Sequence, residues 1–466
     1  MAKLDPETEN NIEELIQAAE AGNAKAQTHL GWCYDEGVRV EVDHEKAFYW
    51  YTLSAEAGDA TGQFNLAMCY ELGTGTEIDY AKAVYWYEKA AAQNDAKALN
   101  TLGVFYEDGK GVPVDFCKAV YFYRQAAELG NESAMVNLGC CYDDGIGVEC
   151  DPVMAAKLYR KAALKGYDIG QYNLALCYEH GTGVRKNMSL AVKWYTKSAE
   201  QGYAAAQNNL GVCYEDGIGV EQDSVQAVKW HKLAAEQNDD VALRNLGEAY
   251  YYGDGVKKCY KKAVEYYTKA AELGNGKAFY KLGICYEDGL GVKKKPVKAF
   301  ECFQKAAEDD YPEAVYYLGS CYYNGRGVEK DLAQAYYWHK KSAELGETTG
   351  MNDIAVVDYG FEIPEREKVE WLQKAADAGD TFALCNLGVR YQLGKGVEKN
   401  EKMAMQLFRK SAKLNEPSAY YALYICYING RGVRKNRQLA LKYLHKSAEL
   451  GYPKARKILK KMESGE

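Results

Sequence analysis

One leucine recurs at a fixed interval through most of the chain. It stands at Leu30, Leu66, Leu102, Leu138, Leu174, Leu210, Leu246, Leu282 and Leu318, with 36 residues between neighbours. Ile354 continues the series, Leu387 follows 33 residues later, and Leu423 comes 36 residues after that. A fixed period of this length is typical of a solenoid, in which each repeat packs only against its neighbours.

Each repeat reads as two helices joined by a glycine turn. In the repeat at 131–166, Ala134, Leu138 and Cys141 are spaced to form one stripe of a first helix, called helix A. Gly139 is expected to let the partner helix approach closely. Gly145 is expected to end helix A in a left-handed conformation, and the turn continues to residue 148.

A second helix, called helix B, is predicted to follow each turn. Its N-cap column reads Asp43, Asp79, Asp115, Asp151, Asn187, Asp223, Asp331, Asn400 and Asn436. Asp and Asn suit this position because their side-chain oxygens accept hydrogen bonds from free backbone N–H groups. We therefore expect an all-α, right-handed α–α superhelix (solenoid) of about twelve 36-residue helix-turn-helix repeats with capping helices.

The predicted boundaries follow from the repeat and its lapses. They are an N-terminal capping helix in 1–22, repeats one to nine in 23–346, a degenerate repeat ten in 347–379, repeats eleven and twelve in 380–451, and a C-terminal capping helix in 452–466. Repeat ten lacks the Gly-x-Gly-Val turn and is three residues short, so we expect a local change of geometry and a candidate hinge there.

Composition and targeting signals indicate a globular protein of the cytoplasm. Hydrophobic residues make up 47% of the 466 residues, which is too many for a disordered chain. No stretch approaches the ~20 apolar residues of a membrane span, and the N-terminus lacks an apolar signal core. The sequence leaves open export to a host by a route that reads no cleavable signal.

The fourteen cysteines follow the repeat. Eight occupy the slot three residues after the repeated Leu: Cys33, Cys69, Cys141, Cys177, Cys213, Cys285, Cys321 and Cys426. Equivalent sulfurs would then lie one helix pair apart, beyond the ~6 Å Cα spacing of a disulfide. We predict free, reduced thiols that act as small apolar side chains.

The repeat resembles the Sel-1-like family, a relative of the tetratricopeptide repeat. The matching residues are Ala-x-x-x-Leu-Gly-x-Cys-Tyr, the Gly-x-Gly-Val turn, and Ala-x-x-Trp-Tyr-x-Lys-Ala-Ala-Glu-x-Gly, with a close copy at Ala83 to Ala91. The resemblance implies an adaptor or scaffold that holds protein partners on a curved surface. Bacterial relatives often serve in signalling, secretion or host contact.

One branch of this family supplies an alternative function. Its members are cysteine-rich, disulfide-stapled and secreted, with reported penicillin binding, so they suggest a cell-wall-related hydrolase or penicillin-binding protein. Their staple joins the end of helix B to the next helix A, where this chain has alanines such as Ala127 and Ala134. The sequence departs from that branch at these positions.

No catalytic or cofactor motif stands out, and we expect a protein that is not an enzyme. His231 and His339 share a column but lie three repeats apart. The Gly-x-Gly turns follow helices and lack the Lys-Ser/Thr of a phosphate-binding loop. No cysteine or histidine cluster has zinc-ligand spacing, so neither a metal nor a cofactor is predicted.

The predicted binding surface is the inner, concave face of the A helices. One column there holds Asn65, Asn137, Asn173, Asn209, Asn245 and Asn386, called the Asn ladder. An Asn side chain offers both a donor and an acceptor, as an extended peptide backbone requires. In tetratricopeptide proteins the Asn at this position often clamps a peptide. The alternative is that each Asn bonds a neighbouring turn.

A second column on this face is acidic. It holds Glu71, Glu107, Asp143, Glu179, Glu215 and Glu287. Acid at a helix C-terminus opposes the macrodipole by roughly 0.3–1 kcal/mol per charge. Either solubility or a basic ligand is expected to offset that cost.

Charge is unevenly distributed along the chain. Residues 398–466 carry 16 Lys and Arg against 6 Asp and Glu, a net charge of +10, whereas the rest has 42 against 60, a net charge of −18. This asymmetry fits head-to-tail self-association or an acidic partner at the last repeats. Nucleic acid is disfavoured, and a purely structural filament is a third alternative. The best-supported expectation is a non-enzymatic scaffold that binds a protein or peptide segment along the inner face.

Overall fold

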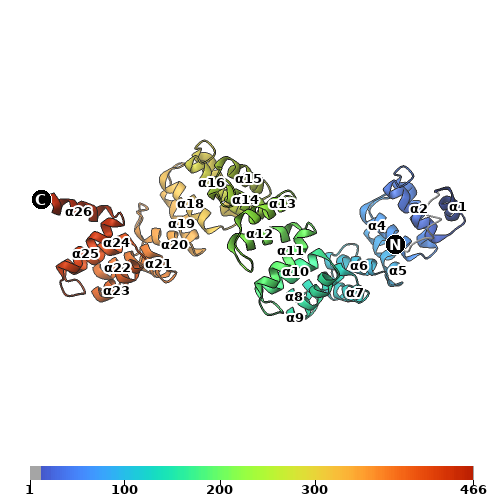
Figure 1. Ribbon diagram of the computed structural model, residues 1–466, viewed down its shortest axis with the longest axis horizontal. Helices are drawn as coiled ribbons and strands as arrows, with labels where there is room; N and C mark the ends of the chain where they lie inside the picture. Colours follow the sequence, from blue (N-terminus) through green and yellow to red (C-terminus); the bar gives the residue numbers. More distant parts are fainter. Residues whose placement is uncertain (1–11, 465–466) are drawn as a thin grey trace. The chain divides into compact units, whose positions relative to one another are not determined.

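The computed structural model describes residues 12–464, and every regular element in that range is an α-helix. Twenty-six helices follow one another in chain order (Figure 1). The parts of the two predicted capping segments at 1–11 and 465–466 lie outside the described residues. The chain divides into two compact units, residues 12–239 and 240–464, each described by itself below.

The even-numbered helices are the predicted A helices. In the first unit they are α2 (Ala24–Glu36), α4 (Ala60–Leu72), α6 (Ala96–Asp108), α8 (Glu132–Asp144), α10 (Asp168–His180) and α12 (Ala204–Asp216). In the second unit they are α14 (Asp240–Tyr252), α16 (Gly276–Asp288), α18 (Pro312–Asn324), α20 (Thr348–Val356), α22 (Thr381–Leu393) and α24 (Pro417–Asn429).

The odd-numbered helices after α1 are the predicted B helices. In the first unit they are α3 (His44–Glu56), α5 (Tyr80–Ala91), α7 (Phe116–Glu128), α9 (Pro152–Leu164), α11 (Met188–Glu200) and α13 (Ser224–Ala235). In the second unit they are α15 (Tyr260–Glu272), α17 (Pro296–Glu308), α19 (Leu332–Glu344), α21 (Glu365–Asp377), α23 (Glu401–Lys413) and α25 (Arg437–Glu449). The helices α1 (Ile12–Glu20) and α26 (Pro453–Ser464) flank the twelve hairpins.

The predicted cap residues begin the B helices. The side chain of Asp115 accepts a hydrogen bond from the backbone N–H of Lys118, and all nine members of the predicted column make the equivalent bond. Cys259 and Lys295 occupy the same position without a side-chain cap. Each A helix that ends in a Gly-x-Gly turn stops at a glycine with positive φ, such as Gly145 at 71°.

Small residues on helix A allow the hairpins to close tightly. An added Cβ on Gly139 would lie 2.5 Å from the ring of Tyr159 on α9, and Gly103 meets Tyr123 on α7 at 2.4 Å. Both rings are buried, as is the repeated Leu beside each glycine. The expectation that Gly139 permits close helix approach is therefore confirmed.

The turn glycines hold successive hairpins together. Gly147 follows α8 and lies against the start of α7, where an added Cβ would be 2.3 Å from the carbonyl oxygen of Phe116. Glutamines add polar contacts between hairpins: the Gln237 amide donates to the carbonyl of Gly202 at 2.9 Å and to Gln207 Oε1 at 2.9 Å. These contacts recur because the same surfaces meet at each junction.

Repeat ten differs from its neighbours. Its helix A, α20, has 9 residues, and an extended Val357 follows it in place of a left-handed glycine. Tyr359 and Ile363 in the connecting segment are buried and fill the space beside Leu372. Arg390 of α22 donates to the carbonyl of Ala355 at 2.8 Å. A hinge in this repeat, and a separate block after it, stay predictions.

All fourteen cysteines are unpaired, as the sequence predicts. The eight members of the repeated slot are buried. Burial raises the pKa of the thiol well above its ordinary value at these positions, to about 12 for Cys69, Cys177 and Cys285. These thiols therefore act as apolar packing groups.

Candidate binding surface

The Asn ladder divides between the two units. Asn65, Asn137, Asn173 and Asn209 lie on α4, α8, α10 and α12 of the first unit, and all are half-buried. The other two members, Asn245 and Asn386, lie on α14 and α22 of the second unit. Four members of the Asn ladder therefore lie in the first unit, where Thr101 interrupts the column, and two lie in the second unit.

The ladder residues have different partners. Asn137 donates to Asn100 Oδ1 on the neighbouring α6 at 3.0 Å, and Asn209 donates to the Tyr195 hydroxyl at 3.4 Å. In the second unit, Asn386 donates to Asn352 Oδ1 at 2.8 Å. The side chains of Asn65 and Asn173 have no hydrogen-bond partner within the described chain. These two amides are available to a ligand.

Most of the acidic column has a partner inside the chain. The hydroxyl of Tyr87 donates to Glu71 at 2.6 Å, and Tyr123 and Tyr195 donate to Glu107 and Glu179, each at 2.5 Å. Each tyrosine lies on helix B of the same hairpin, 16 residues after its carboxylate. Burial and the neighbouring carboxylate raise the pKa of each tyrosine well above its ordinary value.

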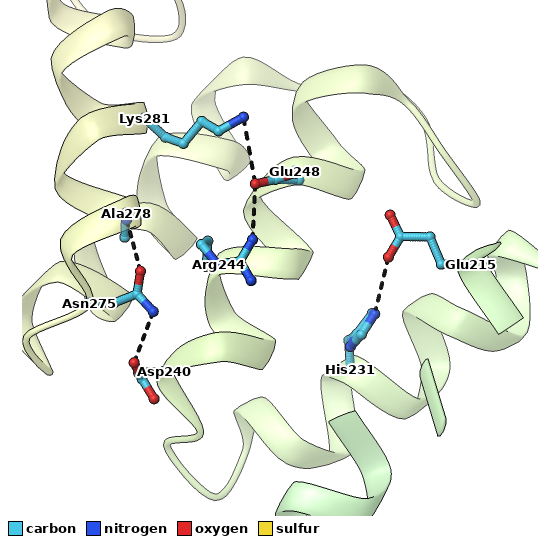
Figure 2. A network of polar contacts seen from close by, with 8 residues as sticks. All are labelled: Glu215, His231, Asp240, Arg244, Glu248, Asn275, Ala278 and Lys281. Carbon is cyan, nitrogen blue, oxygen red and sulfur yellow. Dashed lines mark hydrogen bonds and ion pairs between the residues drawn. The ribbon is translucent and has the colours of Figure 1, made fainter. Parts of the chain in front are cut away.

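These bonds explain the acid at the C-terminal end of helix A. A hydrogen bond to a charged group contributes about 1.5–3 kcal/mol, which exceeds the dipole penalty of about 0.3–1 kcal/mol. Where helix B has no tyrosine at this position, the carboxylate of the acidic column contacts a basic side chain instead. Glu215 lies 3.6 Å from Nε2 of the buried His231 (Figure 2), and Glu287 pairs with Arg326 at 2.5 Å.

A polar cluster in the second unit joins the neighbouring A helices α14 and α16. The carboxylate of Glu248 on α14 forms ion pairs with Arg244 at 3.1 Å and with Lys281 of α16 at 3.6 Å (Figure 2). Asn275 accepts from the N–H of Ala278 and donates to Asp240 at 2.9 Å. The ionic groups in this cluster are already paired with one another, so they stabilise the junction of α14 and α16.

Two equivalent cavities lie beside A helices of the first unit. The first, of about 260 Å³, is lined by Asp35, Glu36, His44, Tyr51, Asn65, Met68, Cys69, Leu72 and Thr74. The second, of about 250 Å³, is lined by Cys140, Asp143, Asp144, Tyr159, Asn173, Leu176, Cys177, His180 and Thr182. Eight of the nine lining positions match at a shift of 108 residues, which is three repeats. The two ladder residues without a partner are the two that line these cavities.

An aspartate distinguishes these hairpins from those with a glutamate in the acidic column. In the second cavity, the Tyr159 hydroxyl lies 3.4 Å from Asp143 and 3.5 Å from the Cys140 sulfur, longer than the bonds that the glutamates accept. In the first cavity, Asp35 accepts from His44 Nδ1 at 2.9 Å, and the Tyr51 hydroxyl has no partner within the described residues. The shorter acid therefore leaves space beside the tyrosine.

The electrostatics of the cavities are acidic. Partial burial and the neighbouring Asp144 raise the pKa of Asp143 above its ordinary value. Neither Asp143 nor Asp144 forms an ion pair within residues 12–464, and neither does Glu36 in the first cavity. Glu36, Asp143 and Asp144 thus have no cationic partner among residues 12–464, whereas Asp35 is bonded to His44.

Some of the sequence-predicted residues line these cavities, and other lining residues were not predicted. Asn65, Asn173 and Asp143 were expected on the inner face, and the structure places them at the cavities. Asp35, His44 and Tyr51 were missed. A signal was present, because Asp35 stands 36 residues before Glu71 and therefore begins the acidic column.

A third cavity, of about 480 Å³, lies in the second unit beside the degenerate repeat. It is lined in part by Asn386, Arg390 and Glu365. Arg390 pairs with Glu365, and Asn386 donates to Asn352. The main polar groups of this third cavity are therefore bonded within the chain, unlike Asn65 and Asn173 at the two cavities of the first unit.

Within residues 12–464, no group of three or more His, Cys, Asp or Glu residues is arranged to hold a metal ion. Over the same residues, no helix combines the length and the apolar character needed to cross a bilayer.

Stacked pairs of antiparallel helices with a lined inner face define the chain as an α-helical repeat protein of the solenoid class. The Sel1 repeat family matches twelve segments: 24–59, 60–95, 96–131, 132–167, 169–203, 204–239, 240–275, 277–311, 312–347, 369–380, 381–416 and 417–452. The chain belongs to the Sel1 repeat family, and the resemblance seen in the sequence is confirmed. This fold supports a general role as a protein-interaction scaffold.

Solved structures of similar proteins agree with this assignment. One is c5321, described as a protective antigen present in uropathogenic Escherichia coli strains displaying an SLR fold: identity is 34%, the TM-score is 0.72, and the match covers 89% of this chain and 90% of that one. Another is a Sel1 repeat protein from Oxalobacter formigenes, with 31% identity and a TM-score of 0.50, covering 66% and 89%. No curated protein matches the chain.

Proposed function

We propose that this chain is a non-enzymatic scaffold that binds a segment of a partner protein along the inner face of the A helices in its first unit. One observation carries the proposal: the unpartnered amides of Asn65 and Asn173 line equivalent cavities three repeats apart. Each amide offers a donor and an acceptor to a partner backbone. The repeat brings the same chemistry to the surface twice, as binding along an extended segment requires.

The hydrolase alternative has no support in the site. Its basis is the cysteine-rich branch of the family, whose members are held by disulfides, whereas all fourteen cysteines of this chain are unpaired. The histidines in the helix B column, His231 and His339, are buried in packing positions. The scaffold is therefore the function that we propose.

Affinity capture of partners tests the proposal. Wild-type protein and the double variant Asn65→Ala/Asn173→Ala are used as baits in parallel, and captured proteins are compared by quantitative mass spectrometry. The double variant should lose the specific partners while keeping its helical circular dichroism and melting temperature. Lys157→Ala, on the exposed side of α9, is the matched control and should retain them. Equal capture by wild type and double variant would contradict the proposal.

A further inference from the structure

The acidic column separates into two kinds of hairpin. Where the column holds glutamate before a tyrosine, as at Glu71, Glu107 and Glu179, the carboxylate reaches the helix B hydroxyl at 2.5–2.6 Å. At Asp35 and Asp143 the side chain is one methylene shorter, and a cavity lies beside each tyrosine. The substitution of Asp for Glu thus marks positions where a hydroxyl, a carboxylate and open space occur together.

The polar groups around the first cavity point to the chemistry of its ligand. Tyr51 is 2% exposed, lines the cavity, and its hydroxyl has no partner within the described residues. Glu36 and Asn65 line the same space, also without a side-chain partner. Asp35 is held by the ring of His44, whose side chain is 50% exposed, through one carboxylate oxygen only. The carboxylates of Asp35 and Glu36 can only accept hydrogen bonds, and the Asn65 amide and Tyr51 hydroxyl can accept them as well, so a cationic donor is the one kind of group that could bond to all four.

The second cavity repeats this arrangement with fewer internal partners. Asp143 and Asp144 both line it, and neither is paired with a cation. The position equivalent to His44 is Pro152, which cannot donate a hydrogen bond. Asn173 again supplies a free amide, and Leu176 supplies an apolar wall. A ligand that carries positive charge on an apolar stem would satisfy all of these groups.

We propose that the two cavities are subsites for lysine or arginine side chains of a basic partner segment. The ammonium or guanidinium group would bond to Asp35 and Glu36, or to Asp143 and Asp144, together with the nearby tyrosine and asparagine oxygens. The alkyl stem would lie against Met68 and Leu72, or against Leu176, as long cationic side chains commonly do. This inference rests on the proposed function and adds to it the class of partner.

Synthetic peptides test the inference directly. The probe is an acetylated, amidated, fluorescent 16-residue peptide of Gly and Ser with four evenly spaced lysines. Its control is the same peptide with every lysine acetylated. Fluorescence anisotropy should show saturable binding of the lysine peptide to wild-type protein and none of the acetylated one. Equal binding of both peptides, or binding of neither, would overturn the inference.

The decisive variant keeps the charge and fills the space. Asp35→Glu/Asp143→Glu leaves the net charge unchanged but extends each carboxylate to its tyrosine, as in the neighbouring hairpins. It should weaken peptide binding by about tenfold or more without lowering the melting temperature. Glu128→Gln removes an exposed charge at the end of α7, outside both cavities, and should change affinity by less than about twofold. Retention of wild-type affinity by the Asp→Glu double variant would overturn the inference.

The outcomes separate this inference from the proposed function. Loss of partner capture in Asn65→Ala/Asn173→Ala, together with unchanged lysine-peptide affinity in the Asp→Glu variant, would leave the scaffold function intact and remove the cationic subsites. Light scattering identifies the source of the basic segment. If the mass rises with concentration in wild type and not in the Asp→Glu variant, the basic segment belongs to a second copy of this chain. That result would overturn the proposal that a different protein supplies the segment.

Discussion

The hydroxyl of Tyr123 donates a hydrogen bond of 2.5 Å to the carboxylate of Glu107 and thereby joins the two helices of one hairpin. Tyr123 is buried against Gly103, whose missing side chain makes room for the ring. The same glycine-or-alanine, tyrosine and glutamate arrangement recurs at Ala67, Tyr87 and Glu71. A single bond type thus closes several hairpins and accounts for the acid at the ends of the A helices.

Removing this hydroxyl should weaken the hairpin. Tyr123→Phe leaves the ring in place but deprives Glu107 of its donor, and the free energy of unfolding should fall by about 1–3 kcal/mol. Urea denaturation followed by circular dichroism measures the change. Tyr121→Phe is the matched control, because that ring is 56% exposed and its hydroxyl has no protein partner. A loss of equal size in both variants would show that the bond to Glu107 contributes nothing.

A second prediction separates backbone strain from hairpin stacking. Gly147 and Gly166 both have positive φ, at 69° and 94°. An added Cβ at Gly166 meets nothing within 4 Å, whereas at Gly147 it would lie 2.3 Å from the Phe116 carbonyl oxygen. Gly166→Ala should therefore lower the free energy of unfolding only by the penalty of placing alanine in the left-handed conformation, about 1–2 kcal/mol. Gly147→Ala should cost about 1–3 kcal/mol more, measured as the difference in urea midpoint. Equal midpoints would contradict the close stacking of α7 under this turn.

Thiol titration provides a third prediction. At pH 7.5, a soluble aromatic disulfide reagent should react rapidly with Cys117 and Cys150, because both side chains are exposed to solvent. The buried slot cysteines should react only after unfolding, because their sulfurs are inaccessible and burial raises the pKa of Cys285 and Cys321 to about 12. All fourteen should react in denaturant without a reductant. Fewer than fourteen in denaturant would indicate disulfides and contradict the structure.

Stability should depend on pH through His339. Burial lowers the pKa of this histidine from 6.5 to about 4. Between these values the unfolded chain binds more protons than the folded one, so the stabilising contribution is full above pH 6.5 and is lost as the pH falls toward 4. A shift of this size corresponds to about 3 kcal/mol. The urea midpoint of wild type should therefore decrease between pH 7 and pH 4.5.

His339→Phe removes the titrating group from that comparison. A phenyl ring fits the column, because Phe303 and Phe408 face equivalent helix A glycines. The variant loses the bond between His339 Nδ1 and the Tyr359 hydroxyl, 2.7 Å in length, and should be less stable at pH 7. Its decrease in urea midpoint between pH 7 and pH 4.5 should be smaller than that of wild type. An identical decrease would show that His339 does not control this pH dependence.

The repeat itself could be predicted from the sequence because each of its parts has a local cause. The spacing of Leu138 and Cys141 predicts the buried stripe of α8, and Gly145 predicts its left-handed C-terminal end. Asp151 predicts the N-cap of α9. Each of these follows from a few neighbouring residues. The predicted helices and their ends were therefore confirmed in the part of the chain that the structure describes.

The tyrosine–acid bond could not be read from one repeat, since its partners are 16 residues apart on different helices. Comparison of the repeats contains a signal. The acidic column has no carboxylate at Gln392 and Ile428. The residues 16 positions later are Phe408 and Leu444, which have no hydroxyl. Glu287 before Phe303 departs from this pattern and pairs with Arg326 instead.

The differences along the Asn ladder depended on contacts between repeats. Asn137 and Asn65 occupy equivalent positions, but Asn137 meets Asn100 on the preceding A helix, whereas Asn65 borders a cavity. The cavities themselves depend on one methylene, the difference between Asp35 or Asp143 and a glutamate. Such effects require the packing of neighbouring hairpins, which column identity alone does not provide.

Site-specific photo-crosslinking tests the central claim most directly. A benzoyl-phenylalanine placed at Met68, which lines the first cavity, is compared with one at Tyr85, which is 51% exposed on α5. Illumination in cell extract, followed by gel electrophoresis, measures which position joins the partner captured by wild-type protein. Binding along the inner face predicts a crosslinked adduct from position 68 and none from position 85. An adduct from position 85 alone would contradict the account.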